Sequence, residues 1–164
     1  MRSEKDKGEA IGEGLNRDVV AARPSPLARR PSVEVAAGLV FRDGKLLITQ
    51  RHADAHLGGL WEFPGGKREA NESFEECLVR ELREELGIEV SVGELVESIH
   101  HEYPGKTVYL RFFRCQWKKN EARALGCSAV EWVSVSELGG YDFPAADARL
   151  LERLRRDRAL WAGE

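Results

Sequence analysis

The stretch GKREANESFEECLVRELREELGI, residues 66–88, predicts one helix whose start and end are both specified. Ser73 and Glu76 have the spacing of a capping box, and Gly87 suits the left-handed residue that ends a helix. Between these signals an apolar residue recurs at every fourth position, which gives the helix a face to bury. These apolar residues are Phe74, Leu78, Leu82 and Leu86. The spacing therefore indicates where the helix lies and which side packs inward.

Three glutamates crowd the C-terminal half of this helix. Glu81, Glu84 and Glu85 share one side, where like charges at such spacing repel. A solvated face is the ordinary interpretation of charged helices, but Arg80 and Arg83 do not separate these carboxylates. A divalent cation removes the repulsion, and carboxylate oxygens suit Mg²⁺ or Mn²⁺. Because Mg²⁺ is usually shared with substrate phosphates, the pattern predicts a phosphorylated ligand.

The residues before the helix predict a hairpin and then a glycine turn. Two β-rich runs flank Arg42-Asp43-Gly44, in which Asp-Gly is a favoured hairpin turn. The runs are VEVAAGLVF (33–41) and KLLITQR (45–51). A short strand, LWEF (60–63), follows, and Pro64-Gly65-Gly66 is expected to terminate it. Without side chains, the two glycines let the backbone approach a metal or a phosphate.

The residues after the helix predict three more strands and a second helix. The strands are IEVSVGELVESIHHEY (88–103), TVYLRFFRCQW (107–117) and AVEWVSV (129–135), and the amphipathic helix spans about 146–161. The order β-β-β-α-β-β-β-α indicates an α/β (α+β) domain with helices on a mixed sheet. We expect residues 33–164 to form this domain and residues 1–32, which mix charge, Gly and Pro, to be a flexible tail.

Composition excludes several classes of partner. The 25 Lys and Arg against 28 Asp and Glu leave a formal charge of -3, so no nucleic acid polymer or anionic membrane is expected to bind. The chain lacks an apolar run long enough to span a bilayer and lacks a secretory signal, which favours a cytoplasmic protein. Its three cysteines have no disulfide or zinc spacing and are expected to be buried thiols.

The helix stretch also resembles the signature of the Nudix hydrolases. That signature is Gly, five residues, Glu, seven residues, Arg-Glu, an aliphatic residue, any residue, Glu-Glu, any residue, Gly and an aliphatic residue. The matching positions are Gly66, Glu72, Arg80, Glu81, Leu82, Glu84, Glu85, Gly87 and Ile88. QRHADAHLGGLWEFPGGK (50–67) and YDFPAAD (141–147) look like the MutT branch, whose members hydrolyse nucleoside triphosphates. The resemblance covers about residues 33–160 and implies a Nudix fold, with a mixed β-sheet sandwiched between helices.

The resemblance implies a metal site on the helix. Glu84 and Glu85 would bind Mg²⁺ or Mn²⁺, Glu81 would be a further ligand or the base, and the Gly65 carbonyl would be a backbone ligand. Arg80 would hold the carboxylates through charge-assisted bonds, and Glu72, like Gly66, would support the site. The implied reaction is attack of an activated water on the β-phosphate, which releases nucleoside monophosphate and pyrophosphate.

The resemblance also implies how the nucleotide is bound. Arg51 and Lys67 match residues that contact phosphates in the family, and they supply local positive charge that the net composition lacks. His56 lies in the ADAH segment, where the MutT branch also has a histidine near the substrate. Asp147 falls at the position that contacts the base.

Gly126 departs from the family pattern. MutT relatives carry a further glutamate six residues before a Trp; here that Trp is Trp132 and the position is Gly126. Glu121, Glu131 or Glu102 would have to substitute, or Glu81 would serve alone as the base.

Asp147 is the second departure, because MutT has an Asn there. An amide both donates and accepts hydrogen bonds, as oxidised guanine requires, whereas an ionised carboxylate only accepts. Asp147 therefore favours a base with an exocyclic amine, such as cytosine or adenine, unless burial keeps it protonated. An equal alternative is an Asp stabilised at a helix N-terminus.

These observations predict a Mg²⁺-dependent nucleoside triphosphate pyrophosphohydrolase, a monomer or dimer, that removes damaged nucleotides such as 8-oxo-dGTP. Three other substrates within the family are CTP or a methylated dCTP, ADP-ribose, and a dinucleoside polyphosphate. A non-catalytic nucleotide-binding module is the alternative from another class; the missing loop glutamate supports it and the complete helix signature opposes it.

Overall fold

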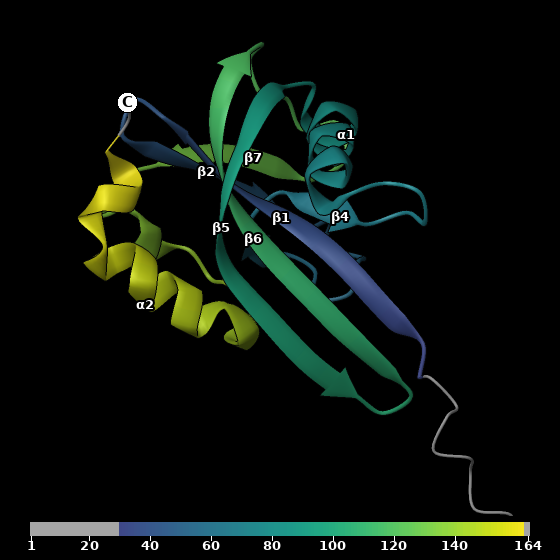
Figure 1. Ribbon diagram of the computed structural model, residues 1–164. Coiled ribbons are helices and arrows are strands. Elements are labelled where there is room, and N and C mark those ends of the chain that lie inside the picture. Colours follow the sequence, from purple (N-terminus) through teal and green to yellow (C-terminus); the bar gives the residue numbers. More distant parts are fainter. Residues whose placement is uncertain (1–29, 163–164) are drawn as a thin grey trace, which may run out of the picture.

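The computed structural model describes residues 30–162, which form one mixed sheet with α1 on one face and α2 on the other (Figure 1). The strands are β1 (Ser32–Arg42), β2 (Lys45–Gln50), β3 (Trp61–Glu62), β4 (Gly65–Lys67), β5 (Glu89–Tyr103), β6 (Lys106–Lys119) and β7 (Ala129–Val133). The helices are α1 (Phe74–Leu86) and α2 (Ala148–Arg156), with 3-10 helices η1 (Leu138–Gly140), η2 (Ala145–Asp147) and η3 (Arg158–Trp161). The predicted mixed sheet between helices is confirmed.

β1 organises the sheet. It pairs in parallel with β6 and antiparallel with β2 and β4, and the sheet runs in the order β3-β2-β1-β6-β5. β7 pairs with β2. Because β4 leads into the loop before α1, its pairing with β1 places the start of that loop against the centre of the sheet.

The ends of α1 are as predicted. The Ser73 hydroxyl accepts from the Glu76 N–H at 3.0 Å, and the Glu76 carboxylate accepts from the Ser73 N–H at 2.8 Å. Gly87 has φ 70° and donates its N–H to the Arg83 carbonyl. The capping box and the left-handed glycine therefore hold the helix in a fixed register.

The short strand ends before Pro64, as predicted, but the expected glycine turn is wrong, because Gly65 and Gly66 belong to strand β4. Gly65 pairs with Ala37, and a Cβ atom at Gly65 would lie 1.9 Å from the Ala36 carbonyl oxygen. Gly65 is thus required by close contact between β4 and β1. The short strand before it is confirmed as β3.

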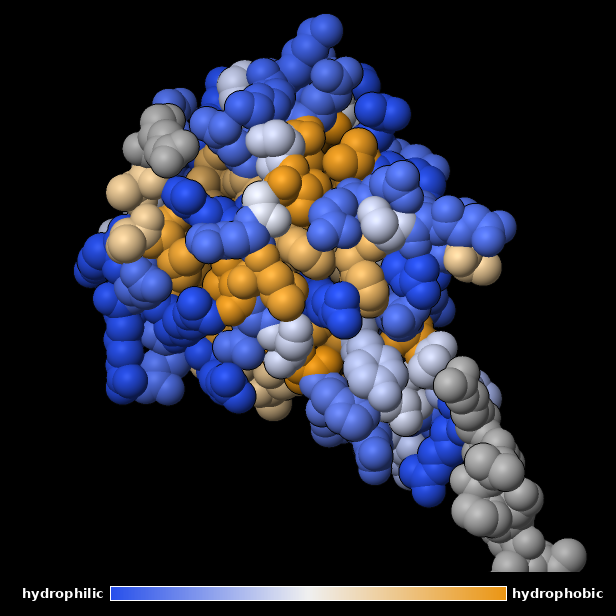
Figure 2. All heavy atoms as spheres, in the orientation of Figure 1, coloured by the Kyte–Doolittle hydropathy of each residue, from blue (hydrophilic) through white to orange (hydrophobic). Residues whose placement is uncertain are grey.

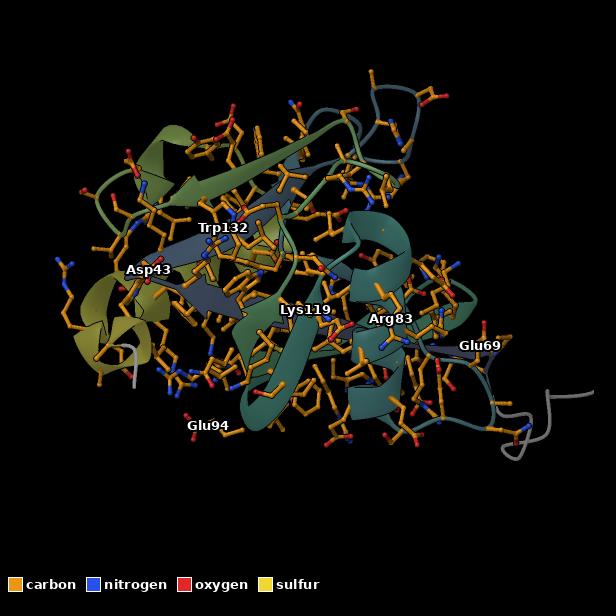
Figure 3. All side chains as sticks on the ribbon, turned by 90° about the horizontal axis from the view of Figure 1, so that it is seen from above. Asp43, Glu69, Arg83, Glu94, Lys119 and Trp132 are labelled. Carbon is orange, nitrogen blue, oxygen red and sulfur yellow. The ribbon has the colours of Figure 1, made fainter. Side chains whose placement is uncertain are left out.

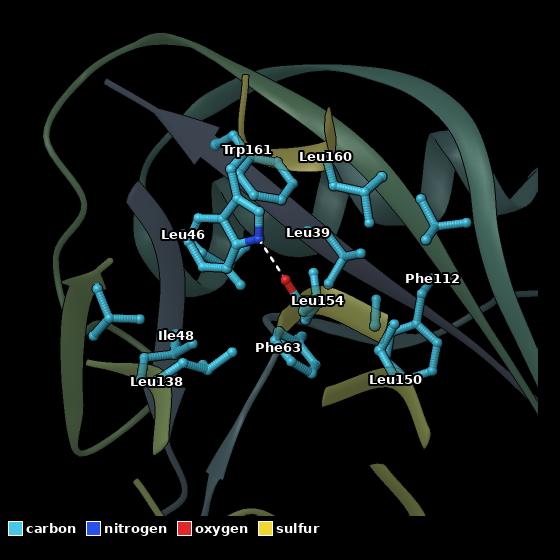
Figure 4. Close-up of a cluster of buried hydrophobic side chains, with 14 residues drawn as sticks. Leu39, Leu46, Ile48, Phe63, Phe112, Leu138, Leu150, Leu154, Leu160 and Trp161 are labelled. Atoms are coloured by element: carbon cyan, nitrogen blue, oxygen red, sulfur yellow. Dashed lines mark hydrogen bonds between the residues drawn. The ribbon is translucent and has the colours of Figure 1, made fainter. Parts of the chain in front are cut away.

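The second helix is shorter than predicted. Instead of one helix over 146–161, α2 ends at Arg156, and Asp157 has ψ 88°, outside the helical range. The Asp157 carboxylate accepts from the Ala159 N–H at 3.2 Å and starts η3. Trp161 then folds back, and its indole N–H donates to the Leu154 carbonyl at 2.8 Å (Figure 4). An Asp that caps a second turn competes with continuation of the helix.

Apolar residues fill both sides of the sheet. The side covered by α2 and η3 has buried residues that include Leu39, Ile48, Phe112, Leu150, Leu154 and Trp161 (Figure 4). The side covered by α1 includes Val40, Leu47, Leu78, Leu82, Leu86 and Phe113. The predicted burial of the cysteines is confirmed, since Cys77, Cys115 and Cys127 are all buried and free.

β5 is the outer strand of the sheet. Hydrophobic residues gather between α1 and α2 on the face shown in Figure 2, and Leu95 of β5 is 48% exposed.

The tail predicted for residues 1–32 lies outside the described residues up to residue 29, and Ser32 already belongs to β1. Among residues 30–162, no helix is long and apolar enough to cross a membrane.

Candidate active site

Arg80 connects the acidic residues of the site. Its guanidinium donates to Glu72 at 2.6 and 3.0 Å, to Glu81 at 2.9 Å and to Glu84 at 3.3 Å. The hydrogen bonds that Arg80 donates to Glu72, followed by one from the Glu69 N–H, lower the pKa of Glu72 to about 2. Glu69 itself lies in the loop before α1, at the edge of the molecule (Figure 3). Arg80 therefore holds Glu81 and Glu84 of α1 from one point, as the family resemblance implies.

Gly66 and Glu81 share one small space. A Cβ atom at Gly66 would lie 2.2 Å from Cδ of Glu81 and 2.5 Å from each of its carboxylate oxygens. The Glu81 side chain is only 14% exposed. The absence of a side chain at Gly66 thus makes room for a carboxylate, and this contact was not foreseen from the sequence.

The Glu85 carboxyl is partly buried and lies among other carboxylates. Burial, followed by the nearby Glu81, Glu62 and Glu84, raises the pKa of its carboxyl to about 7, while Arg51 opposes them. A carboxylate surrounded by carboxylates is stabilised most by a cation. The charges around Glu85 therefore fit a divalent metal.

The donor set suits a hard cation. The carboxylates of Glu84 and Glu85, with Glu81 beside them, offer only oxygen ligands, which Mg²⁺ and Mn²⁺ prefer. Arg80 binds Glu81 and Glu84, and within residues 30–162 no three His, Cys, Asp or Glu side chains are grouped as ligands of a single ion. The support for a metal is therefore the concentration of carboxylate charge at the end of α1, because these carboxylates are not already arranged around one ion.

Arg51 lies beside the carboxylates. Its Nη1 donates to Glu62 at 2.8 Å, and its Nε donates to the His56 carbonyl at 2.7 Å. His56 thus contributes its backbone, and its side chain is exposed. Lys67 has an exposed side chain, and its carbonyl accepts from Arg80 at 3.2 Å. Of the predicted phosphate contacts, Arg51 is the one with a side chain fixed at the site.

The segment 141–147 packs on β3 through aromatic pairs. Trp61 contacts Tyr141 with ring centroids 4.9 Å apart, and Phe63 stacks on Phe143 at 5.1 Å. The Trp61 N–H donates to the Asp142 carbonyl at 2.8 Å. This packing places the rest of the segment, up to Asp147, next to β3, the strand that contains Glu62.

Asp147 is buried next to this strand. It is 6% exposed, and burial, with a smaller effect of Glu62, raises the pKa of its carboxyl to about 6. It occupies the position before α2 but makes no capping hydrogen bond with its side chain. Asp147 therefore stands at the N-terminus of α2, as its alternative interpretation expects, but without a capping hydrogen bond, and burial dominates its pKa.

Glu62 is the site residue that the sequence interpretation missed. Its charge acts on both Glu85 and Asp147, and it is the ion-pair partner of Arg51. A usable signal was present in Trp-Glu-Phe, because alternation in a strand puts Glu62 on the side opposite two aromatic residues.

The three proposed substitutes for the loop glutamate lie elsewhere. Glu121 binds Arg42 at 2.9 and 3.1 Å and is 73% exposed, and Glu102 lies near the turn of the β5–β6 hairpin with 66% exposure. Glu131 is exposed on β7 opposite Ile48. Within the described part of the chain, none of the three forms a hydrogen bond or ion pair with a site residue.

Comparisons with known proteins identify a family, related sequences and similar structures. The model of the NUDIX domain matches residues 36–153. The CTP pyrophosphohydrolase of Escherichia coli K12 is 43% identical over 127 residues, which cover 77% of this chain and 94% of that protein. The 8-oxo-dGTP diphosphatase of the same strain is 34% identical over 76% of this chain and 97% of its own length. The crystal structure of a MutT protein from Methanosarcina mazei Go1 superposes with a TM-score of 0.68 at 26% identity, over 78% of this chain and 96% of that one.

The fold, the helix of glutamates and these matches show that the chain belongs to the Nudix hydrolase family. Within this family it is a MutT-like enzyme, as predicted from its sequence. Hydrolases of the family act on nucleotide substrates and generally need divalent metal ions.

Proposed function

We propose that this enzyme is a Mg²⁺- or Mn²⁺-dependent nucleoside triphosphate pyrophosphohydrolase. The observation that carries the proposal is the crowding of Glu81, Glu84 and Glu85 on one side of α1, where the charge of Glu62 is added to theirs. So many carboxylates at the end of one helix are costly unless a cation and its phosphate ligand complete the site. A site built for binding alone has no need of this arrangement, so catalysis is the better account.

The chain's own residues divide the work of the reaction. Glu84, Glu85 and the Gly65 carbonyl would hold the metal, and Arg80 fixes the direction of Glu81. When bound, the divalent cation lowers the pKa of the attacking water and neutralises phosphate charge. The water oxygen bonds to the β-phosphorus and its proton passes to Glu81. The bond from the β-phosphorus to the bridging oxygen breaks, and that oxygen leaves with the nucleoside monophosphate.

Arg51 and Lys67 attract the triphosphate. Arg51 already lies at the carboxylates, held by Glu62 and by the His56 carbonyl, so its positive charge is placed beside the acidic cluster. Lys67 is exposed at the end of β4 and is free to turn toward a phosphate. Both cations offset the negative charge that would otherwise repel the substrate.

Glu62 and Asp147 favour a base that presents an exocyclic amine. An ionised carboxylate accepts from the amine, and a protonated carboxyl donates to the neighbouring ring nitrogen. Asp147 supplies either form, because its pKa of about 6 lies near neutrality. Cytosine carries both groups on one edge, so CTP or a methylated dCTP is the substrate we place first. The E. coli relative that is 43% identical is named for CTP.

The second candidate is 8-oxo-dGTP. A protonated Asp147 both donates and accepts, as an amide does, and therefore also matches the edge of oxidised guanine. The relative that is 34% identical is named for this nucleotide. Removal of damaged nucleotides from the cytoplasmic pool, by a monomer or dimer without a nucleic acid polymer as partner, is the cellular role that follows.

A panel of nucleotides distinguishes the candidates. Purified enzyme with Mg²⁺ is incubated with CTP, 5-methyl-dCTP, 8-oxo-dGTP, ADP-ribose and a dinucleoside polyphosphate, and the products are separated by chromatography. Monophosphate and pyrophosphate from CTP or from 8-oxo-dGTP are the expected result. Ribose phosphate and AMP from ADP-ribose would move the enzyme to another substrate class. Calorimetric binding of nucleotide without any Mg²⁺-dependent product would leave only a binding module.

A further inference from the structure

The segment between β6 and β7 closes the C-terminal end of α1. We call residues 120–128 the capping segment. The N–H groups of Leu125 and Gly126 both donate to the Glu85 carbonyl at 3.0 Å, and the Arg123 N–H donates to the Leu86 carbonyl at 3.0 Å. The last carbonyls of a helix have no partner within the helix. Here the capping segment satisfies them, so the backbone of Glu85 is bound directly by Gly126.

Both ends of the capping segment are anchored. It leaves β6 after Lys119, next to α1 (Figure 3), and the Asn120 side chain donates to the Gly87 carbonyl at 3.2 Å. The Trp117 indole N–H donates to the Asn120 carbonyl at 2.7 Å. At the other end the Ser128 N–H donates to the Gln50 carbonyl at 2.8 Å. The contact between Gly126 and Glu85 is therefore held from two sides.

Gly126 is not required by its own backbone conformation. It is absent from the residues with positive φ, so an L-residue fits its dihedral angles. The constraint is space: a Cβ atom at Gly126 would lie 3.0 Å from Cγ, 3.2 Å from Cβ and 3.3 Å from Cα of Glu85. Such contacts are tighter than nine in ten of those that real Cβ atoms make, so the neighbour must move by a few tenths of an ångström.

We propose that Gly126 is a positioning residue, which sets the side chain of Glu85 for the metal by its N–H and by its lack of a side chain. The inference rests on the proposed role of Glu85 as a metal ligand. Mg²⁺ requires nearly ideal octahedral geometry, so a displacement of a few tenths of an ångström weakens its binding. Position 126 thus orders the existing carboxylate, and the side chain of the extra glutamate in the MutT pattern would crowd Glu85.

Two variants of Gly126 test this assignment against a matched control. Gly126→Ala adds the crowding atom, and Gly126→Glu adds the family's carboxylate. Gly140→Ala is the control, since a Cβ atom at Gly140 would meet nothing within 4 Å and Gly140 has no positive φ. The readouts are the Mn²⁺ dissociation constant of the nucleotide-free protein by calorimetry, the Mg²⁺ dependence of turnover and the KM for nucleotide.

We expect Gly126→Ala to raise the Mn²⁺ dissociation constant about tenfold, as substitutions behind a metal ligand commonly do. The KM for nucleotide at saturating Mg²⁺ should change little, because the proposed role of Gly126 acts on the metal ligand Glu85. Gly126→Glu should bind Mn²⁺ and turn over no better than Gly126→Ala. Gly140→Ala should behave as wild type in every readout.

The assignment would be overturned if Gly126→Ala bound Mn²⁺ as tightly as wild type, or if Gly126→Glu turned over faster than Gly126→Ala. Wild-type protein that binds Mn²⁺ but hydrolyses no nucleotide would refute the proposed function alone, and Gly126 would then be judged by Mn²⁺ affinity. If Gly126→Ala does not fold, NMR of the wild type decides: Mg²⁺ must shift the amides of Leu125 and Gly126 and leave that of Gly140 in place. Amides of Leu125 and Gly126 that do not respond to Mg²⁺ would again overturn it.

Discussion

Gly66 of β4 and Glu81 of α1 occupy adjoining parts of one space, with the carboxylate 2.2 to 2.5 Å from where a Cβ atom of residue 66 would be. The relationship explains why the middle residue of β4, the strand next to the helix, is a glycine. It also means that the acidic cluster is shaped from two sides, by β4 and by the guanidinium of Arg80.

Gly66→Ala should reduce activity strongly. The added methyl group cannot coexist with Glu81 in its present position, so the carboxylate must move away from Arg80 and from the metal. Turnover is measured at saturating Mg²⁺ beside the unfolding temperature. Gly139→Ala is the control, since the nearest atom to a Cβ there is the end of the Arg155 side chain at 3.9 Å. An active Gly66→Ala protein would show that Glu81 has no fixed role.

Glu85→Gln should lower turnover by about three orders of magnitude while the protein still folds. Without metal the variant should be more stable than wild type, because the substitution removes one charge from a crowded group. Thermal unfolding with EDTA and then with Mg²⁺ measures this. Mg²⁺ should stabilise the wild type and have little effect on the variant; equal stabilisation of both would mean that Glu85 does not bind the metal. Glu84→Gln should lose activity similarly.

Arg80→Lys should lower turnover about 10- to 100-fold. A lysine ammonium has no planar fork, so it cannot bind Glu72 through two bonds and also reach Glu81 and Glu84. Steady-state kinetics at varied Mg²⁺ should show a higher half-saturating Mg²⁺ concentration. Arg83→Lys serves as the control, because Arg83 is exposed on α1 (Figure 3). Equal kinetics for the two variants would contradict the organising role of Arg80.

Asp147→Asn should become more stable relative to wild type as the pH rises. The pKa of Asp147 is raised from 3.8 to about 6 in the folded protein. Its contribution to stability is therefore complete below its unfolded pKa and is lost as the pH rises through about 6. The asparagine does not ionise, so the difference in unfolding free energy should grow by about 2 kcal/mol between about pH 4 and pH 8. Denaturant titrations at several pH values test this, and a constant difference would contradict the burial of an ionising carboxyl.

The same variant tests the base pocket. An asparagine presents both a donor and an acceptor at every pH, so Asp147→Asn should shift preference from CTP toward 8-oxo-dGTP. The ratio of kcat/KM values for the two nucleotides is the measurement. A ratio equal to that of wild type would remove Asp147 from base recognition and leave Glu62 as the remaining candidate.

Most of the fold followed from local patterns. The capping box and Gly87 define α1 by hydrogen bonds within a few residues, so they were predicted correctly. The β5–β6 hairpin likewise follows from alternation and a glycine turn. β4 was missed because its glycines carry no strand signal, and its existence depends on β1 coming close. The break at Asp157 was missed because the apolar period continues past it.

The sequence by itself determined the family and the acidic residues of the site, because the spacing Arg80-Glu81-Glu84-Glu85 places carboxylates on one side of any helix it forms. Only the tertiary structure decided that Glu62 pairs with Arg51 and acts on Asp147, and that the Gly126 N–H binds the Glu85 carbonyl. These contacts join segments far apart in the chain. Their distances depend on strand register and on how loops pack, which no local pattern of residues encodes.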